Sequence, residues 1–166
     1  MKFRFILFIL ILVSSRAYSA SSAFQAVVVA HNEANIVESN TLHFGTIART
    51  PGASCNIDGV GSVSGQCATA DANIAVGVIS ISGLIINQAY QIDVVGSDNG
   101  VLRFSPAITV DNISVSDHDS DQQVSTVIMQ STESADILVY GSLEVLSLLQ
   151  ASQSYHANYT VNVNFQ

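Results

Sequence analysis

The chain has 166 residues, of which 48% are hydrophobic, so it can bury a sizeable core within one domain. Its formal net charge is −8, with only five Lys and Arg residues. Nucleic acid is therefore excluded as a partner, because binding it requires cations that neutralise phosphates. The same shortage of cations disfavours anionic membrane surfaces.

The first 19 residues are typical of a secretory signal peptide. Lys2 and Arg4 form a basic flank, and residues 6–13 form an apolar run too short to span a bilayer. Small residues at Ala17 and Ser19 flank Tyr18 in the pattern that a signal peptidase reads, so we expect cleavage after Ser19. The alternative is a buried N-terminal strand. Cleavage would leave residues 20–166 as a single domain.

Loss of the signal peptide makes the chain strongly acidic. Lys2, Arg4 and Arg16 go with it, so Arg49 and Arg103 remain as two cations against 13 acidic residues, a net charge of −11. The acidity favours a well-solvated surface. No later apolar run reaches transmembrane length. We therefore expect an exported protein without a membrane span in its mature part.

Alternation of apolar and polar residues with period two dominates the rest of the chain. This pattern predicts extended strands, and Asp98-Asn99-Gly100 predicts a turn between two of them. A helix is an alternative only over 142–152. Short strands separated by Gly and Ser turns favour an all-β, immunoglobulin-like or pilin-like antiparallel β-sandwich. The expected extended segments are 22–31, 35–48, 73–83, 89–96, 106–117, 122–130, 135–149 and 155–165.

Two cysteines, Cys55 and Cys67, are separated by residues rich in Gly and Ser, which allow this segment to bend back as a hairpin. An even number of cysteines in an exported chain predicts a disulfide between them. In the chain-entropy account, closing a loop of this size stabilises the fold by roughly 3 kcal/mol. A metal site is disfavoured, because no CxxC motif or nearby His supplies further ligands.

No arrangement of residues predicts catalysis. The four histidines, His31, His43, His118 and His156, are spread along the chain, and we expect surface or hydrogen-bonded strand positions for each. There is no Gly-x-Ser-x-Gly motif, and neither cysteine is free to act as a nucleophile if both form a disulfide. We therefore expect a protein that is not an enzyme and that uses no cofactor.

One acidic cluster, Asp117, Asp119 and Asp121, has the alternate spacing that begins many calcium loops. However, Gln122 stands where such a loop needs glycine for its sharp turn, and Ile128 stands where it needs a bidentate Glu. The pattern favours a solvated loop. A calcium site is the alternative.

Three motifs occur in a characteristic order: "LHFGTIA" at 42–48, "VYGSLEV" at 139–145 and "YHANYTVNVNF" at 155–165. Together they resemble a pilin-like β-sandwich domain of unknown function found in exported bacterial proteins. The chain is also similar to subunits of archaic chaperone–usher pili, whose last strand ends in a Val-x-Val-Asn-Phe type of sequence. Tyr140 and Gln153 stand where the family pattern has glycine.

The resemblance implies assembly by donor-strand complementation, in which a sandwich that lacks a strand is completed by a strand from a partner. It implies a periplasmic chaperone, an outer-membrane usher and neighbouring subunits as partners, and a surface fibre for adhesion or biofilm formation as the product. The acceptor strand would present Tyr159, Val161, Val163 and Phe165. The donor strand would lie within 20–31 and present Phe24, Ala26, Val28 and Ala30.

Two other interpretations remain open at the sequence level. Phe24 to Ala30 can be the first strand of the chain's own sandwich, beside an ordinary last strand. The second interpretation is a self-complete secreted module that binds carbohydrate or calcium. This interpretation predicts a stable monomer that needs no chaperone.

Overall fold

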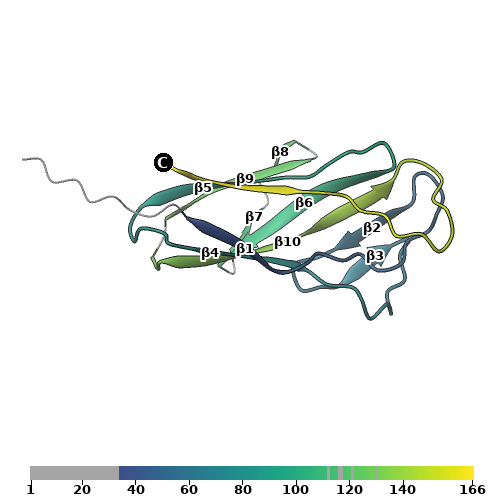
Figure 1. Cartoon of the computed structure of the whole chain (residues 1–166), viewed down its shortest axis with the longest axis horizontal. Coiled ribbons are helices and arrows are strands. Elements are labelled where there is room, and N and C mark those ends of the chain that lie inside the picture. Colours follow the sequence, from purple (N-terminus) through teal and green to yellow (C-terminus); the bar gives the residue numbers. More distant parts are fainter. Residues whose placement is uncertain (1–33, 112, 116–117, 121, 130) are drawn as a thin grey trace, which may run out of the picture. The chain divides into compact units, whose positions relative to one another are not determined.

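A computed structural model describes residues 34–166 except 112, 116–117, 121 and 130 (Figure 1). All of these residues belong to one compact unit, Asn32–Gln166. Every regular element in this part of the chain is a β-strand, and all strand pairs are antiparallel. No helix there is long and apolar enough to cross a membrane.

The larger sheet is built around β10 (Ser134–Val145). One edge of β10 pairs with β6 (Leu102–Val110), which also pairs with β7 (Ile113–Val115). The other edge pairs first with β4 (Gly77–Ser82) and then with β2 (Ser54–Ile57). Outside these, β1 (Asn35–Asn40) pairs with β4, and β3 (Val63–Gly65) pairs with β2.

The smaller sheet has the strand order β11-β5-β9-β8. It comprises β5 (Ala89–Val95), β8 (His118–Ser120), β9 (Gln123–Met129) and β11 (Thr160–Phe165). Figure 1 shows this sheet facing the larger one, with β11 in yellow along its border. β11 and β8 are the two edge strands.

The two sheets enclose one hydrophobic core. Apolar residues alternate along β5 and β10 because successive side chains of a strand point to opposite faces. The most deeply buried side chains of the two sheets are 0–7% exposed, and those of β10 are Ala135, Ile137, Val139, Leu143 and Val145. Opposite them lie Tyr90, Ile92, Val94 and Val124 of the smaller sheet. The prediction of an all-β antiparallel sandwich is therefore confirmed.

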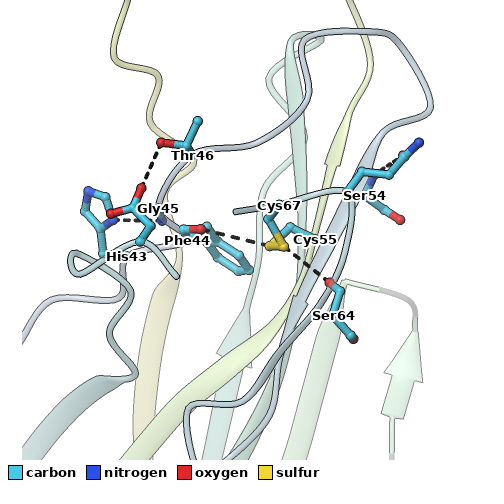
Figure 2. The surroundings of a disulfide bond; sticks show 10 residues. His43, Phe44, Gly45, Thr46, Ser54, Cys55, Ser64 and Cys67 are labelled. Carbon is cyan, nitrogen blue, oxygen red and sulfur yellow. Dashed lines mark hydrogen bonds between the residues drawn. A yellow bond between two sulfur atoms is a disulfide. The ribbon is translucent and has the colours of Figure 1, made fainter. Parts of the chain in front are cut away.

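The sequence also predicted two local features that the structure confirms. Cys55 and Cys67 form a disulfide, and their Cα atoms lie 5.4 Å apart beside the β2–β3 hairpin (Figure 2). At the predicted turn, the backbone N–H of Gly100 donates to the Asp98 carboxylate at 2.9 Å, and Gly100 has a φ of 77°. This positive φ is a conformation that glycine adopts without a steric penalty.

A polar network covers the outer face of the smaller sheet. Asp93 on β5 accepts hydrogen bonds from Gln91 at 2.9 Å, from Asn164 at 3.5 Å and from Ser125. Gln166 donates to the side-chain oxygen of Gln91 at 2.9 Å. These contacts join β11, β5 and β9 on the side away from the core.

Candidate functional site: a groove between two strand edges

A groove of about 1130 Å³ lies between β1 and β11, where the two sheets are not joined. Its first wall is formed by β1 and the segment up to Arg49, and its second wall by residues 149–161. Apolar side chains of the sandwich core form the floor, namely Ile79, Leu102, Phe104 and Leu143. The volume exceeds the roughly 300–1,000 Å³ typical of small-molecule pockets.

The predicted acceptor strand forms part of the second wall. The side chains of Tyr159, Val161 and Val163 are partly buried and pack against the core, whereas Phe165 is 61% exposed. Tyr155 and Ala157 continue the same inward alternation before β11 begins. The structure therefore places Val161, Val163 and Phe165 in β11 and Tyr159 directly before it, and Tyr155 and Ala157 extend the inward-facing series.

The backbone of β11 is paired on one side only, within the part of the chain that the structure describes. In an antiparallel ladder, alternate residues direct their N–H and C=O groups to the same neighbouring strand. Gln166 donates to the carbonyl oxygen of Ala89, and the register places Asn162 and Asn164 in the same set, facing β5. The backbone groups of Val161 and Val163 therefore point to the open edge.

The opposite wall also offers an open strand edge. Among the described strands, β1 pairs only with β4, and all six of its residues are exposed. Ile36 lines the groove and is 41% exposed although it is a large apolar residue. Exposed strand edges with apolar side chains are aggregation hazards unless something covers them. The groove thus has the two features that an added strand requires, namely unpaired backbone and an apolar floor.

Tyr159 spans the groove. Its hydroxyl donates to Glu38 Oε1 at 3.1 Å, and its ring lies 6.0 Å from the ring of Phe104. Burial, together with the charge of Glu38, raises the pKa of Tyr159 to about 12. A Cβ atom at Gly77 would lie 3.2 Å from the Tyr159 hydroxyl, so glycine in β4 leaves room for it.

Polar groups at the rim of the groove are held by local hydrogen bonds. Asp71 accepts from the Thr46 hydroxyl at 2.8 Å and from the backbone N–H of Asn73 at 3.0 Å. Hydrogen bonds from Asn73 and Thr46 hold the pKa of Asp71 below its ordinary value. His43 accepts from the N–H of Gly45, and the carbonyl oxygen of His156 accepts from Asn99. Asp71, His43 and the carbonyl group of His156 therefore take part in hydrogen bonds that hold neighbouring segments of the chain in place.

Several predicted residues lie outside the described residues. They include the whole donor face, Phe24, Ala26, Val28 and Ala30, as well as His31, Asp117 and Asp121. Only the backbone of His118 and Asp119, in β8, is described. Within the described residues, no three His, Cys, Asp or Glu side chains are grouped so that they could hold a metal ion.

The comparisons identify the family. The family model "Domain of unknown function (DUF4402)" matches residues 35–165. The chain belongs to this family. Searches of curated proteins and of solved structures found no match.

Tyr140 stands where the pattern given in the sequence analysis has glycine, and the structure shows how the ring is accommodated. Its hydroxyl donates to the carbonyl oxygen of Ile108 at 3.2 Å and lies 3.1 Å from Thr109 Oγ1. A Cβ atom at Gly59 would lie 3.1 Å from the Tyr140 ring. Gly59 therefore leaves the space that Tyr140 occupies.

Proposed function

We propose that this protein is a structural subunit of a bacterial surface fibre that assembles by donor-strand complementation. In this proposal a strand from a neighbouring copy enters the groove between β1 and β11. The observation that carries the proposal is the open backbone edge of Val161 and Val163 beside the apolar floor at Phe104. The fibre would serve adhesion or biofilm formation.

The groove supports an extended peptide better than a compact ligand. The inward residues from Tyr155 to Val163 follow one another at every second position. An added strand would gain affinity from backbone hydrogen bonds along this edge and register from side chains that fill the spaces between the sheets. A donor that presents alternate apolar side chains fits this requirement.

The chain contains a suitable donor before β1. Phe24, Ala26, Val28 and Ala30 alternate with other residues, and residues 20–32 contain no Lys, Arg, Asp or Glu. Insertion of this segment into the next copy repeats the same contact without closing a ring, so it produces a fibre. Before assembly, a periplasmic chaperone would cover the groove, and an outer-membrane usher would receive the complex. The proposal gives the chain no catalytic role.

The test compares residues 20–166 with residues 32–166, both exported to a periplasm without a dedicated chaperone. Size by light scattering and stability by thermal unfolding are measured for each. We expect the longer chain to form a series of oligomers or fibres. The shorter chain should be unstable until a peptide of residues 22–31 is added.

Matched peptides make this test specific for the donor face. Changing Phe24 and Val28 to Asn should abolish stabilisation by the peptide, whereas changing Val27 and Val29 to Asn should preserve most of it. Two well-folded monomers, one from each chain, would contradict the proposal and favour the self-complete binding module. A longer chain that is monomeric and a shorter chain that is unfolded would instead identify residues 22–31 as the chain's own first strand.

A further inference from the structure

Arg49 lies at one end of the groove and holds the two walls together there. Its Nε donates to the carbonyl oxygen of Leu149 at 2.8 Å, and the N–H of Leu149 donates to the carbonyl oxygen of Arg49 at 3.0 Å. Among the described residues, its guanidinium takes part in no ion pair. Its terminal nitrogens are therefore available to a carboxylate that arrives along the groove.

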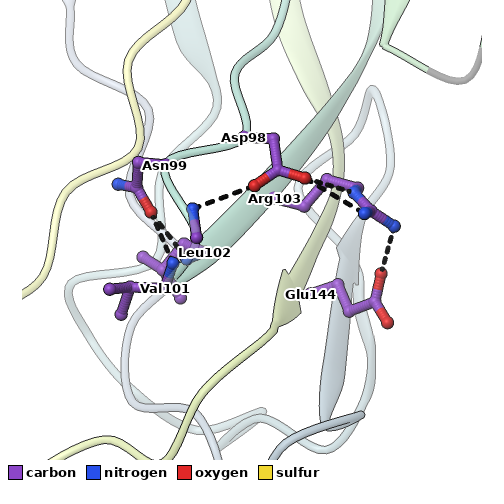
Figure 3. A network of polar contacts seen from close by, with 7 residues as sticks. Asp98, Asn99, Val101, Leu102, Arg103 and Glu144 are labelled. Carbon is purple, nitrogen blue, oxygen red and sulfur yellow. Dashed lines mark hydrogen bonds and ion pairs between the residues drawn. The ribbon is translucent and has the colours of Figure 1, made fainter.

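The other cation of residues 20–166 is already paired. Arg103 contacts Asp98 at 3.0 Å and Glu144 at 3.3 Å, as Figure 3 shows. It does not line the groove. Arg49 is thus the cation that distinguishes one end of the groove from the other, and it can determine the direction of a bound strand.

The two walls of the groove run in opposite directions. Glu38 contacts Tyr159, and further along the first wall Arg49 contacts Leu149. Any strand between the walls is therefore parallel to one of them and antiparallel to the other. The second wall leads into β11, whose ladder with β5 is regular from Thr160 to Phe165, whereas the pairing of β1 shifts register between Glu38 and Asn40. Since antiparallel ladders are the more stable, we expect the donor to run antiparallel to β11.

This direction places the C-terminal end of the donor beside Arg49. Packing of large against small side chains then favours one register, in which Ala26 lies opposite Tyr159 and Ala30 lies opposite Tyr155. In the same register, Phe24 lies opposite Val161 and Val28 opposite Ala157. Glu33 follows three residues after Ala30, which brings it toward the turn at Ser152, a residue that lines the groove with Arg49.

Glu33 is the only Lys, Arg, Asp or Glu side chain in residues 20–33. Resting on the proposed function, we infer that Arg49 of one copy binds the Glu33 carboxylate of the next, and that this ion pair sets donor direction and register. In the sequence, β1 begins two residues after Glu33, and β1 lies toward the Glu38 end of the first wall, away from Arg49. We therefore expect this pair to form between copies and not within one.

Charge reversal tests the inference with the mature chain, residues 20–166. Assembly is followed by light scattering at low salt for the wild type, Arg49→Glu, Glu33→Arg and the double variant. Each single variant should assemble about tenfold more slowly, because attraction between exposed charges becomes repulsion. The double variant should assemble within about twofold of the wild type, because the pair is restored with reversed sign.

Arg103→Glu serves as the matched control, since it reverses the other cation outside the groove. Its assembly rate should stay near that of the wild type and should not respond to Glu33→Arg. Single variants that assemble like the wild type, or a double variant that is as slow as either single variant, would overturn the Arg49–Glu33 pair and leave fibre assembly standing. A wild-type chain that does not assemble would overturn both proposals.

Discussion

Two strands with the same alternating pattern, β10 and β11, have different neighbours in the sandwich. On the closed side, β10 has neighbours along both edges, and its inward residues are at most 7% exposed. On the open side, β11 is paired along one edge among the described strands, and Phe165 at its end is 61% exposed. Alternation thus gives a strand one apolar face, but it does not determine whether both backbone edges find partners.

The largest expected loss of stability follows substitution of Gly141, at the point where the pairing partner of β10 changes from β4 to β2. Its φ is +132°, and a Cβ atom there would lie 2.2 Å from the carbonyl oxygen of Ser105. Gly141→Ala should lower the free energy of unfolding by about 3 kcal/mol or more, measured by urea denaturation. Gly100→Ala, with a φ of +77° and open space around it, should cost only about 1 kcal/mol. Equal losses of unfolding free energy at the two positions would show that the backbone near Ser105 can move to admit the added Cβ atom.

A smaller effect on stability is expected from removing the disulfide, which ties β2, a neighbour of β10, to the segment after β3. Cys55 is fully buried, and Cys67 Sγ lies 3.3 Å from the carbonyl oxygen of Ser64 (Figure 2). Replacing both cysteines by Ala should lower the free energy of unfolding by roughly 3 kcal/mol in the chain-entropy model, slightly less than Gly141→Ala. Reduction of the wild-type protein should lower its unfolding midpoint in the same direction. An unchanged midpoint in both experiments would contradict this estimate.

The smallest effect concerns Tyr159 on the open side. Its pKa rises from 10.0 to about 12 on folding, so the folded state holds this proton more tightly than the unfolded state. The resulting stabilisation is fully present below pH 10 and is lost as the pH rises toward 12. The free energy of unfolding should therefore fall more steeply over this range in the wild type than in Tyr159→Phe. Tyr140→Phe, which keeps Tyr159, should retain the wild-type slope.

Features of the fold that depend on local patterns could be predicted from the sequence. The alternation of apolar and polar residues predicted β5, β9, β10 and β11, and the sequence Asp-Asn-Gly predicted the turn from Asp98 to Gly100. The Cys spacing predicted the disulfide and the hairpin around it. These features depend on residues close together in the chain, where side-chain chemistry and backbone geometry decide the outcome.

Features of the site that depend on packing between the sheets could not be predicted. The apolar pattern marks Phe104 as a core residue but does not show that it forms the floor of a groove. Likewise, Glu38 and Arg49 approach Tyr159 and Leu149 from positions about 100 residues or more away in the sequence. Their partners depend on how two separate sheets meet, and no local spacing encodes this.

The polar network around Asp93 has a consequence for the precision of the open edge. A shift of β11 by two residues would keep Val161 and Val163 on the apolar face, so the core alone discriminates poorly against it. Such a shift would, however, separate Asn164 from Asp93 and Gln166 from Gln91. The solvent-facing side chains therefore fix one register of β11 where the buried side chains would allow two, and they hold the free edge of β11 in that alignment.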